Sequence, residues 1–152
     1  MRRIIHLSIL MTSIVLFTGC SKVVFYDDNQ PVITGSWVLT DAAHKDAYGW
    51  YPVITGVEYG VFHFYSNGTA RYTERGVTMT GTWRMITEYG GYYDEYGNYY
   101  HDSHATLRVN VSDYYGDETI NMYFDHVRVY GNRFVATNYN NHYIERYRFE
   151  RY

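Results

Sequence analysis

The stretch Gly35-Ser36-Trp37-Val38-Leu39 contains a glycine, a small hydroxyl residue and a tryptophan, followed by apolar residues. A related stretch returns as Gly81-Thr82-Trp83-Arg84-Met85. Each copy predicts a β-strand that turns its tryptophan toward a hydrophobic core. We therefore interpret the residues after Cys20 as strands and turns gathered around these two tryptophans.

The amino-acid composition favours one all-β domain. The chain has 152 residues, a length typical of a single domain, and its 46% hydrophobic and 20% aromatic residues suffice for a packed core. Its 20 tyrosines suit half-buried sheet surfaces, because the ring is apolar and the hydroxyl can stay in water. Leucine, alanine, glutamate and lysine, the usual helix formers, are scarce after residue 20.

Alternation and turn residues predict about eight strands, spaced roughly ten residues apart. Between Val77 and Ile86, apolar and polar side chains alternate as in a sheet with one buried face. Asn67-Gly68 is a strong hairpin signal, and a phase slip near Asp125-His126 predicts a bulge or turn. This spacing is typical of an up-and-down antiparallel barrel or a sandwich. We take the barrel as the predicted fold.

Residues 41–51 interrupt this pattern. Asp41 could cap a helix, and three alanines follow within six residues. The segment predicts a short helix or an irregular crossover, which Pro52 would end.

The N-terminus predicts export and lipidation. Arg2 and Arg3 precede an apolar run that is too short to be a good membrane span. The run ends in Leu16-Phe17-Thr18-Gly19-Cys20, which resembles the lipobox of bacterial lipoproteins. We expect a signal peptide over 1–19, a lipid-anchored tether over 20–31 and a domain over 32–152. The alternative is an ordinary secretory peptide. A lipidated Cys20 would place the protein in the cell envelope, held to a membrane that we expect to be the outer one.

Charge and cysteine content narrow the classes of partner. Loss of residues 1–19 would leave 11 basic against 16 acidic side chains, a net charge of −5 instead of −3. Nucleic acid is a poor partner for such a chain, because it binds a basic face. Cys20 is the only cysteine, so no intramolecular disulfide can form.

An ordered set of short motifs resembles one known family. Gly35-Ser36-Trp37, the run 64–69, Gly81-Thr82-Trp83 and the run 147–151 occur in an order similar to that of the lipocalin-like domain of small Bacteroides-type lipoproteins. The resemblance covers about residues 32–152. It implies a barrel in which Trp37 packs near an arginine of the last strand, and an envelope location. The cation could come from Arg146, Arg148 or Arg151. The resemblance implies no defined ligand.

The tyrosine-rich segment 88–103 is the first candidate site. Glycine, asparagine and aspartate punctuate its tyrosines, which predicts a long loop or a protruding hairpin. Aromatic rings with hydroxyls make good recognition surfaces. The alternative is that the rings pack over the barrel mouth or pair across a hairpin. The candidate binding residues are Tyr89, Tyr92, Tyr93, Tyr96, Tyr99 and Tyr100.

The barrel interior is a second candidate, because methionine and aromatic side chains suit an apolar ligand. With so many bulky side chains in a small domain, we favour a filled core. The residues concerned are Phe62, Phe64, Met79, Met85, Leu107, Met122 and Phe134.

Metal binding and catalysis are poorly supported. His101 and His104 lie close in sequence to three carboxylates, Asp94, Glu95 and Asp102, but this set matches no zinc or calcium spacing. No nucleophile elbow, phosphate loop or zinc-helix motif occurs. We expect no cofactor, no metal and no enzymatic activity.

The sequence therefore predicts a lipid-anchored envelope binding protein that uses a barrel mouth or a tyrosine-rich rim. Its partner could be a small apolar molecule, a glycan or an envelope protein. The alternative is a structural or interaction module of an envelope assembly, with a filled barrel and no small-molecule ligand.

Overall fold

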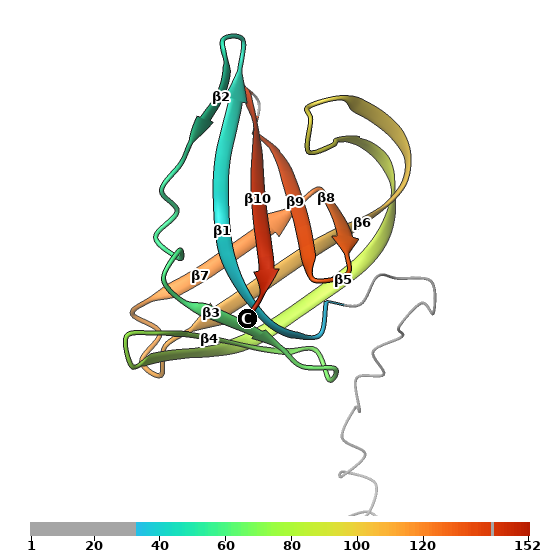
Figure 1. Cartoon of the computed structure of the whole chain (residues 1–152). Helices are drawn as coiled ribbons and strands as arrows, with labels where there is room; N and C mark the ends of the chain where they lie inside the picture. The colour runs from blue at the N-terminus through green and yellow to red at the C-terminus, as the bar shows by residue number, and fades with distance from the viewer. Residues whose placement is uncertain (1–32, 141) are drawn as a thin grey trace, which may run out of the picture.

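The computed structural model describes residues 33–140 and 142–152, which contain strands and no helix (Figure 1). The all-β prediction is confirmed for this part of the chain. No helix long and apolar enough to cross a membrane occurs within these residues. The strands are β1 (Gly35–Asp46), β2 (Gly49–Pro52), β3 (Val61–Phe64), β4 (Thr69–Glu74), β5 (Val77–Tyr93), β6 (Tyr99–Ser112), β7 (Thr119–Phe124), β8 (His126–Tyr130), β9 (Arg133–Asn140) and β10 (Tyr143–Arg151).

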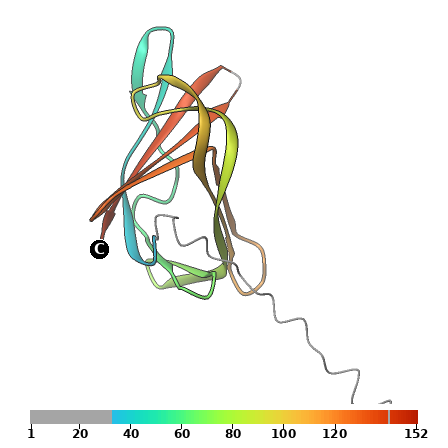
Figure 2. The same ribbon diagram turned by 90° about the vertical axis from the view of Figure 1, so that its right-hand side faces the viewer.

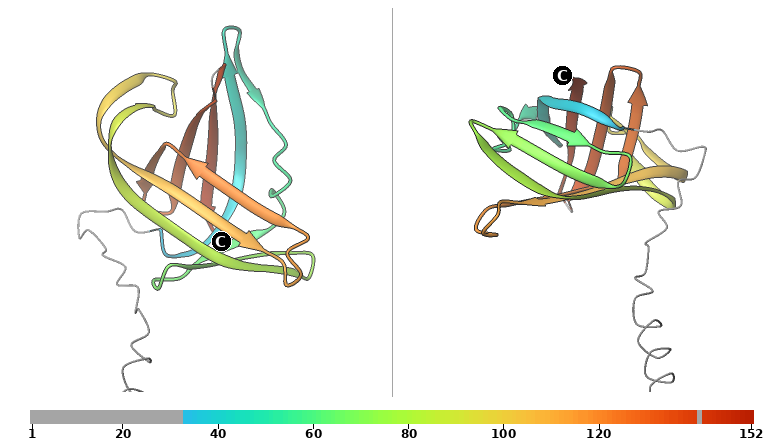
Figure 3. Two further views of the ribbon diagram at one scale, coloured as in Figure 1. Left: turned by 180° about the vertical axis from the view of Figure 1, so that it is seen from behind. Right: turned by 90° about the horizontal axis from the view of Figure 1, so that it is seen from below.

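All ten strands belong to one antiparallel sheet. Nine follow the order β7-β6-β5-β4-β3-β1-β10-β9-β8, and β2 pairs with β1 off this path. The sheet curves strongly, so that β5, β6 and β7 lie behind β1, β9 and β10 (Figures 1 and 3). Its two ends, β7 and β8, are separated in sequence only by Asp125, yet no ladder joins them. The sheet is therefore not closed by hydrogen bonds.

Aromatic side chains in mutual contact fill the space between the two halves of the curved sheet. The rings of Phe134 and Phe149 stack at 4.4 Å, and Trp37 meets Phe134 edge-on at 4.8 Å. Of the residues considered as a cavity lining, five are buried in this core, and Met85 and Met122 pack against it. The interior of the curved sheet is therefore filled with side chains at these seven positions.

Trp37 is fully buried, and both its indole N–H and its ring face contact neighbouring groups. Its Nε1 donates a hydrogen bond of 2.7 Å to the carbonyl of Ile33. The guanidinium of Arg151 lies 4.3 Å from the ring centroid, and its Nη1 donates to the carbonyl of Thr34. Gly35 has φ +117°, and a Cβ there would overlap Nη1 of Arg151. Of the three arginines considered, Arg151 supplies the cation over Trp37.

The tryptophan of the second stretch, Gly81-Thr82-Trp83, also faces the core. Trp83 is buried, and its Nε1 donates a hydrogen bond of 2.9 Å to the carbonyl of Tyr65. A Cβ on Gly81 would overlap the carbonyl oxygen of Asn110 on β6. The glycine therefore permits close pairing of β5 and β6 two residues before the tryptophan.

The prediction of a helix or irregular crossover at 41–51 is wrong. Strand β1 continues to Asp46, and β2 returns from Gly49. The Asp46 carboxylate accepts the amide hydrogens of Tyr48 and Gly49, which closes a tight hairpin turn. Pairing with β10 along Asp41–Lys45 satisfies the backbone there, which overrides the weak helix preference of the alanines.

The predicted count of about eight strands becomes ten for two reasons. The hairpin after Asp46 contributes β2, and the phase slip near Asp125-His126 marks the break between β7 and β8. The Asn67-Gly68 turn is confirmed, since Gly68 has φ +81° and donates its amide hydrogen to the carbonyl of Tyr65. The signal peptide, the tether and Cys20 lie outside the described residues.

Candidate functional site

The far end of the β5–β6 hairpin forms an arm, which we define as residues 88–104. Its strands stay paired as far as Tyr93 and Tyr99, so the segment is a protruding hairpin and not a long loop. The arm reaches past the body of the sheet and curls back over it (Figures 1 and 2). Histidine and tyrosine contacts join it to β8, an edge strand that pairs only with β9.

Asp94 organises the turn at the tip of the arm. Its Oδ1 accepts the amide hydrogens of Tyr96 at 2.9 Å and Asn98 at 2.8 Å, and its Oδ2 accepts from the side-chain amide of Asn98. Gly97 completes the turn with φ +83°. Burial alone would raise the pKa of the Asp94 carboxyl, but the hydrogen bonds from Asn98, Tyr96 and Gly97 outweigh it and lower the pKa.

The carbonyls of the tip accept hydrogen bonds from three other strands. Thr137 of β9 donates to the carbonyl of Tyr93 at 2.5 Å. Arg146 of β10 donates to the carbonyl of Glu95 at 3.3 Å, and Lys45 of β1 donates to that of Tyr96 at 3.1 Å. The arm is therefore fastened to the sheet through its backbone, independently of most of its side chains.

Glu95 is the side-chain anchor of the tip. It is 8% exposed, and its carboxylate accepts a hydrogen bond of 2.6 Å from the hydroxyl of Tyr130 on β8. Burial and this carboxylate together raise the pKa of the Tyr130 hydroxyl, which keeps the phenol protonated and able to donate.

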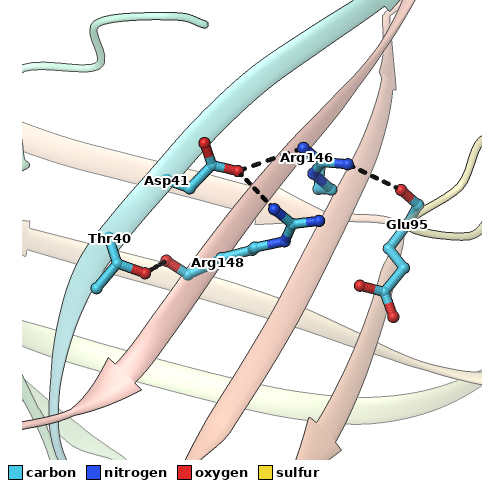
Figure 4. A network of polar contacts seen from close by, with 5 residues as sticks. All are labelled: Thr40, Asp41, Glu95, Arg146 and Arg148. Atoms are coloured by element: carbon cyan, nitrogen blue, oxygen red, sulfur yellow. Dashed lines mark hydrogen bonds and ion pairs between the residues drawn. The ribbon is translucent and has the colours of Figure 1, made fainter. Parts of the chain in front are cut away.

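Arg146 connects the tip to the body of the sheet (Figure 4). Its Nη2 lies 3.3 Å from Oδ2 of Asp41, which also pairs with Arg148 at 3.2 Å. The guanidinium stacks over Trp50 at 4.2 Å from the ring centroid. Burial, followed by the neighbouring charge of Arg148, lowers the pKa of Arg146, while Asp41 opposes the shift. The same side chain thus holds β1, β2 and the arm together.

The six candidate tyrosines divide into two groups. Tyr92 stacks on His126 at 4.3 Å and Tyr93 packs on Tyr139 at 4.9 Å, so these two rings attach the arm to β8 and β9. The other four are more exposed, with exposed fractions of 77%, 64%, 60% and 43%, although Tyr99 packs on Tyr93 and Tyr100 on Tyr92. They are Tyr89, Tyr96, Tyr99 and Tyr100.

His126 lies beneath the arm, stacked on Tyr92 and close to His104 and Arg128. Its Nδ1 is buried and has no hydrogen-bond partner among the described residues. Burial, and then the neighbouring His104 and Arg128, lower its pKa to about 4. It borders a small recess between the tip and the sheet, lined by Asp94, Glu95, His126, Arg128, Val135 and Thr137.

The histidines and carboxylates of the segment do not converge on a common point. Asp94 is engaged by the turn and Glu95 by Tyr130, while Nδ1 of His104 lies 3.0 Å from the carbonyl of Asp102. Within 33–140 and 142–152, no three histidine, cysteine or acidic side chains are placed to hold a metal ion.

The anchoring residues were not found from the sequence. Thr137, Tyr130 and Arg146 lie 35 to 51 residues away from the arm positions that they bind. The only local signal was an acidic pair, Asp94-Glu95, directly before a glycine turn.

Comparisons with protein-family models, with curated proteins and with solved structures found no match.

Proposed function

We propose that this protein is a lipid-anchored binding protein of the bacterial cell envelope, and that the arm carries its binding surface. The proposal rests on one observation: the tip of the arm is bound to the sheet, and the arm holds exposed tyrosine rings. Tyr89, Tyr96, Tyr99 and Tyr100 face solvent on a hairpin whose turn is bound to three other strands. Exposed tyrosines also occur elsewhere, for example Tyr114 and Tyr115, but those of the arm are carried by a tip that other strands hold in place.

The physical reason is preorganisation. A tyrosine ring offers a large contact area, a hydroxyl for hydrogen bonding and only two side-chain torsions to fix. A scaffold that already holds such rings in place lowers the entropic cost of binding. The contacts of Asp94 and Glu95 provide that scaffold, because they set the shape of the turn and its position on the sheet.

The filled interior supports a surface partner over a small molecule in a barrel mouth. The rings of Trp37, Phe134 and Phe149 occupy the space that an apolar ligand would need. We therefore propose an envelope protein or a glycan as the partner. The same filled interior favours the second candidate function, a structural module whose arm is a permanent contact in an envelope assembly.

We also propose that the sheet is a lipocalin-like barrel. The stacking of Arg151, from the last strand, over Trp37 supports this arrangement, since the family resemblance implies such a pair. The contacts of the arm and of β6 with β8 support it too, because they bring the two ends of the sheet together. Membrane attachment through Cys20, at the outer membrane, rests on the lipobox alone. We propose neither a catalytic role nor a cofactor.

Native mass spectrometry of the protein purified from its own envelope tests the proposal. We expect a retained partner with the wild-type chain and its loss in the triple variant Tyr89→Ser, Tyr99→Ser, Tyr100→Ser. The matched control is Tyr114→Ser with Tyr115→Ser, which removes exposed rings from the β6–β7 loop, at the end of β6 away from the arm. Equal retention by the triple variant, with its fold intact, would refute the assignment of the arm.

A further inference from the structure

We propose that the arm is a latch that acidification releases, with His126 as the group that takes up the proton. The inference rests on the proposed function, because it concerns how the same surface is regulated.

The imidazole of His126 lies where the arm meets the sheet. Its ring stacks on that of Tyr92 with centroids 4.3 Å apart and an interplanar angle of 18°. Its Nδ1 is buried without a hydrogen-bond partner in the described chain. A neutral imidazole suits this position, because its stacking on Tyr92 requires no polar partner. A protonated ring would need one for each N–H, and burial would deprive it of water.

Several ionisable or polar groups face His126, and they come from every element around it. Tyr92 comes from β5, and Asp102 and His104 come from β6. Asp94 and Glu95 come from the turn, Arg128 from β8 and Thr137 from β9.

The carboxylates in this set are already engaged. Asp94 accepts the amides of its own turn, Glu95 accepts from Tyr130, and Asp102 accepts from the hydroxyl of Tyr92. Asp94 and Asp102 do favour the charged imidazole, but burial, and then His104 and Arg128, outweigh them. A proton on His126 is therefore accommodated best when the arm moves away.

The sign of the effect follows from linkage. The pKa of His126 is about 4 with the arm docked and returns toward 6.5 when the ring reaches water. The docked arm thus binds fewer protons than the released arm. Docking is at full strength above pH 6.5 and is lost as the pH falls from 6.5 toward 4. Between pH 7.5 and pH 5.0 the docking equilibrium should weaken roughly 25-fold.

Release would change the binding surface in two ways. The exposed tyrosines would lose the fixed orientation that the docked tip imposes, which raises the entropic cost of binding. The edge of β8, which the arm contacts when docked, would also become accessible to other strands. We infer that the closed arm binds the partner and that acid weakens binding.

Hydrogen–deuterium exchange on the full chain, without a partner, tests the latch. After correction for the intrinsic pH dependence of exchange, peptides covering 88–104 should lose protection roughly 25-fold between pH 7.5 and pH 5.0. Peptides covering β3 and β4 serve as an internal reference, because no hydrogen bond or ring contact joins them to the arm in the described structure.

Variants separate the roles of the residues. His126→Phe keeps a ring against Tyr92 but cannot titrate, so its arm should keep its protection at pH 5.0. His142→Phe, at an exposed position in the β9–β10 turn, should respond to pH as the wild type does. Thr137→Val removes the hydrogen bond to the carbonyl of Tyr93 and should move the release to higher pH.

Two results would overturn the latch: unchanged protection of the wild-type arm at pH 5.0, or the same acid response in His126→Phe. If His126→Phe does not fold, an NMR titration of wild-type His126 decides the question, since a pKa near 6.5 contradicts the proposal. These measurements need no partner, so the latch can fail while the tyrosine surface still binds, and the reverse.

Discussion

The hydroxyl of Tyr130 donates a hydrogen bond of 2.6 Å to the carboxylate of Glu95, a residue 35 positions earlier in the chain. One partner lies on the edge strand β8 and the other at the tip of the arm. Because Glu95 is buried, its carboxylate depends on this bond for compensation. The contact therefore connects the position of the arm to the stability of the sheet edge.

Removing that hydroxyl should loosen the arm. In Tyr130→Phe the buried carboxylate of Glu95 loses its donor, which costs about 1–3 kcal/mol. Hydrogen exchange should report the loss in residues 88–104, with a smaller change in β3 and β4. Tyr114→Phe is the control, since that ring is 93% exposed. Equal effects of the two substitutions would show that the contact does not hold the arm.

Replacing Gly35, two residues before Trp37, should destabilise the fold for two separate reasons. Gly35→Ala imposes a Cβ on a residue with φ +117° and drives it into the guanidinium of Arg151. We expect a loss of about 1–3 kcal/mol in the free energy of unfolding, measured by urea denaturation. Gly49→Ala is the matched control, because φ is +138° there and no atom lies within 4 Å of the added carbon. If Gly49→Ala costs as much, the overlap with Arg151 contributes nothing.

Asp94 and His126 should act in different pH ranges. The pKa of Asp94 is below its ordinary value of 3.8, so its contribution to stability is complete above about pH 3.8 and is lost as the pH falls further. Asp94→Asn should destabilise the arm at pH 7 by about 1–2 kcal/mol and reduce the additional loss of stability below pH 3.8. Acid titration of the unfolding midpoint checks this. A variant that loses stability as the wild type does below pH 3.8 would contradict the role of Asp94.

Membrane attachment should depend on one atom, the sulfur of Cys20. Cys20→Ser cannot be acylated on the side chain, so the protein should move from the membrane fraction to the soluble fraction of the envelope. We expect the domain over residues 33–152 to fold unchanged. Membrane fractionation with an unchanged distribution would remove the lipoprotein assignment.

Local patterns carried most of what the sequence could predict. Trp37 and Trp83 face the core as expected, because alternation along a strand fixes the buried face. The Asn67-Gly68 turn was predictable, because both residue types tolerate positive φ. The strand conformation of segment 41–51 was not predictable, because three alanines do not indicate whether a distant strand such as β10 will supply hydrogen bonds.

The candidate site was predictable only in part. The tyrosines and turn residues of the arm predicted a long loop or a protruding hairpin, but nothing local distinguished the anchoring rings of Tyr92 and Tyr93 from the exposed ones. That distinction is made by His126 and Tyr139, which lie on other strands. Contacts of this kind depend on how the sheet curves, and one sequence gives no direct measure of curvature.

Photo-crosslinking in the native envelope tests the central claim, that the exposed tyrosines of the arm bind a partner. A benzophenone side chain would replace Tyr99 in the arm or, as the control, Tyr114 in the β6–β7 loop; both rings are exposed. We expect a discrete crosslinked adduct from position 99, competed away by excess untagged wild-type protein, and none from position 114. Absence of an adduct at position 99, or equal adducts at both positions, would contradict the account.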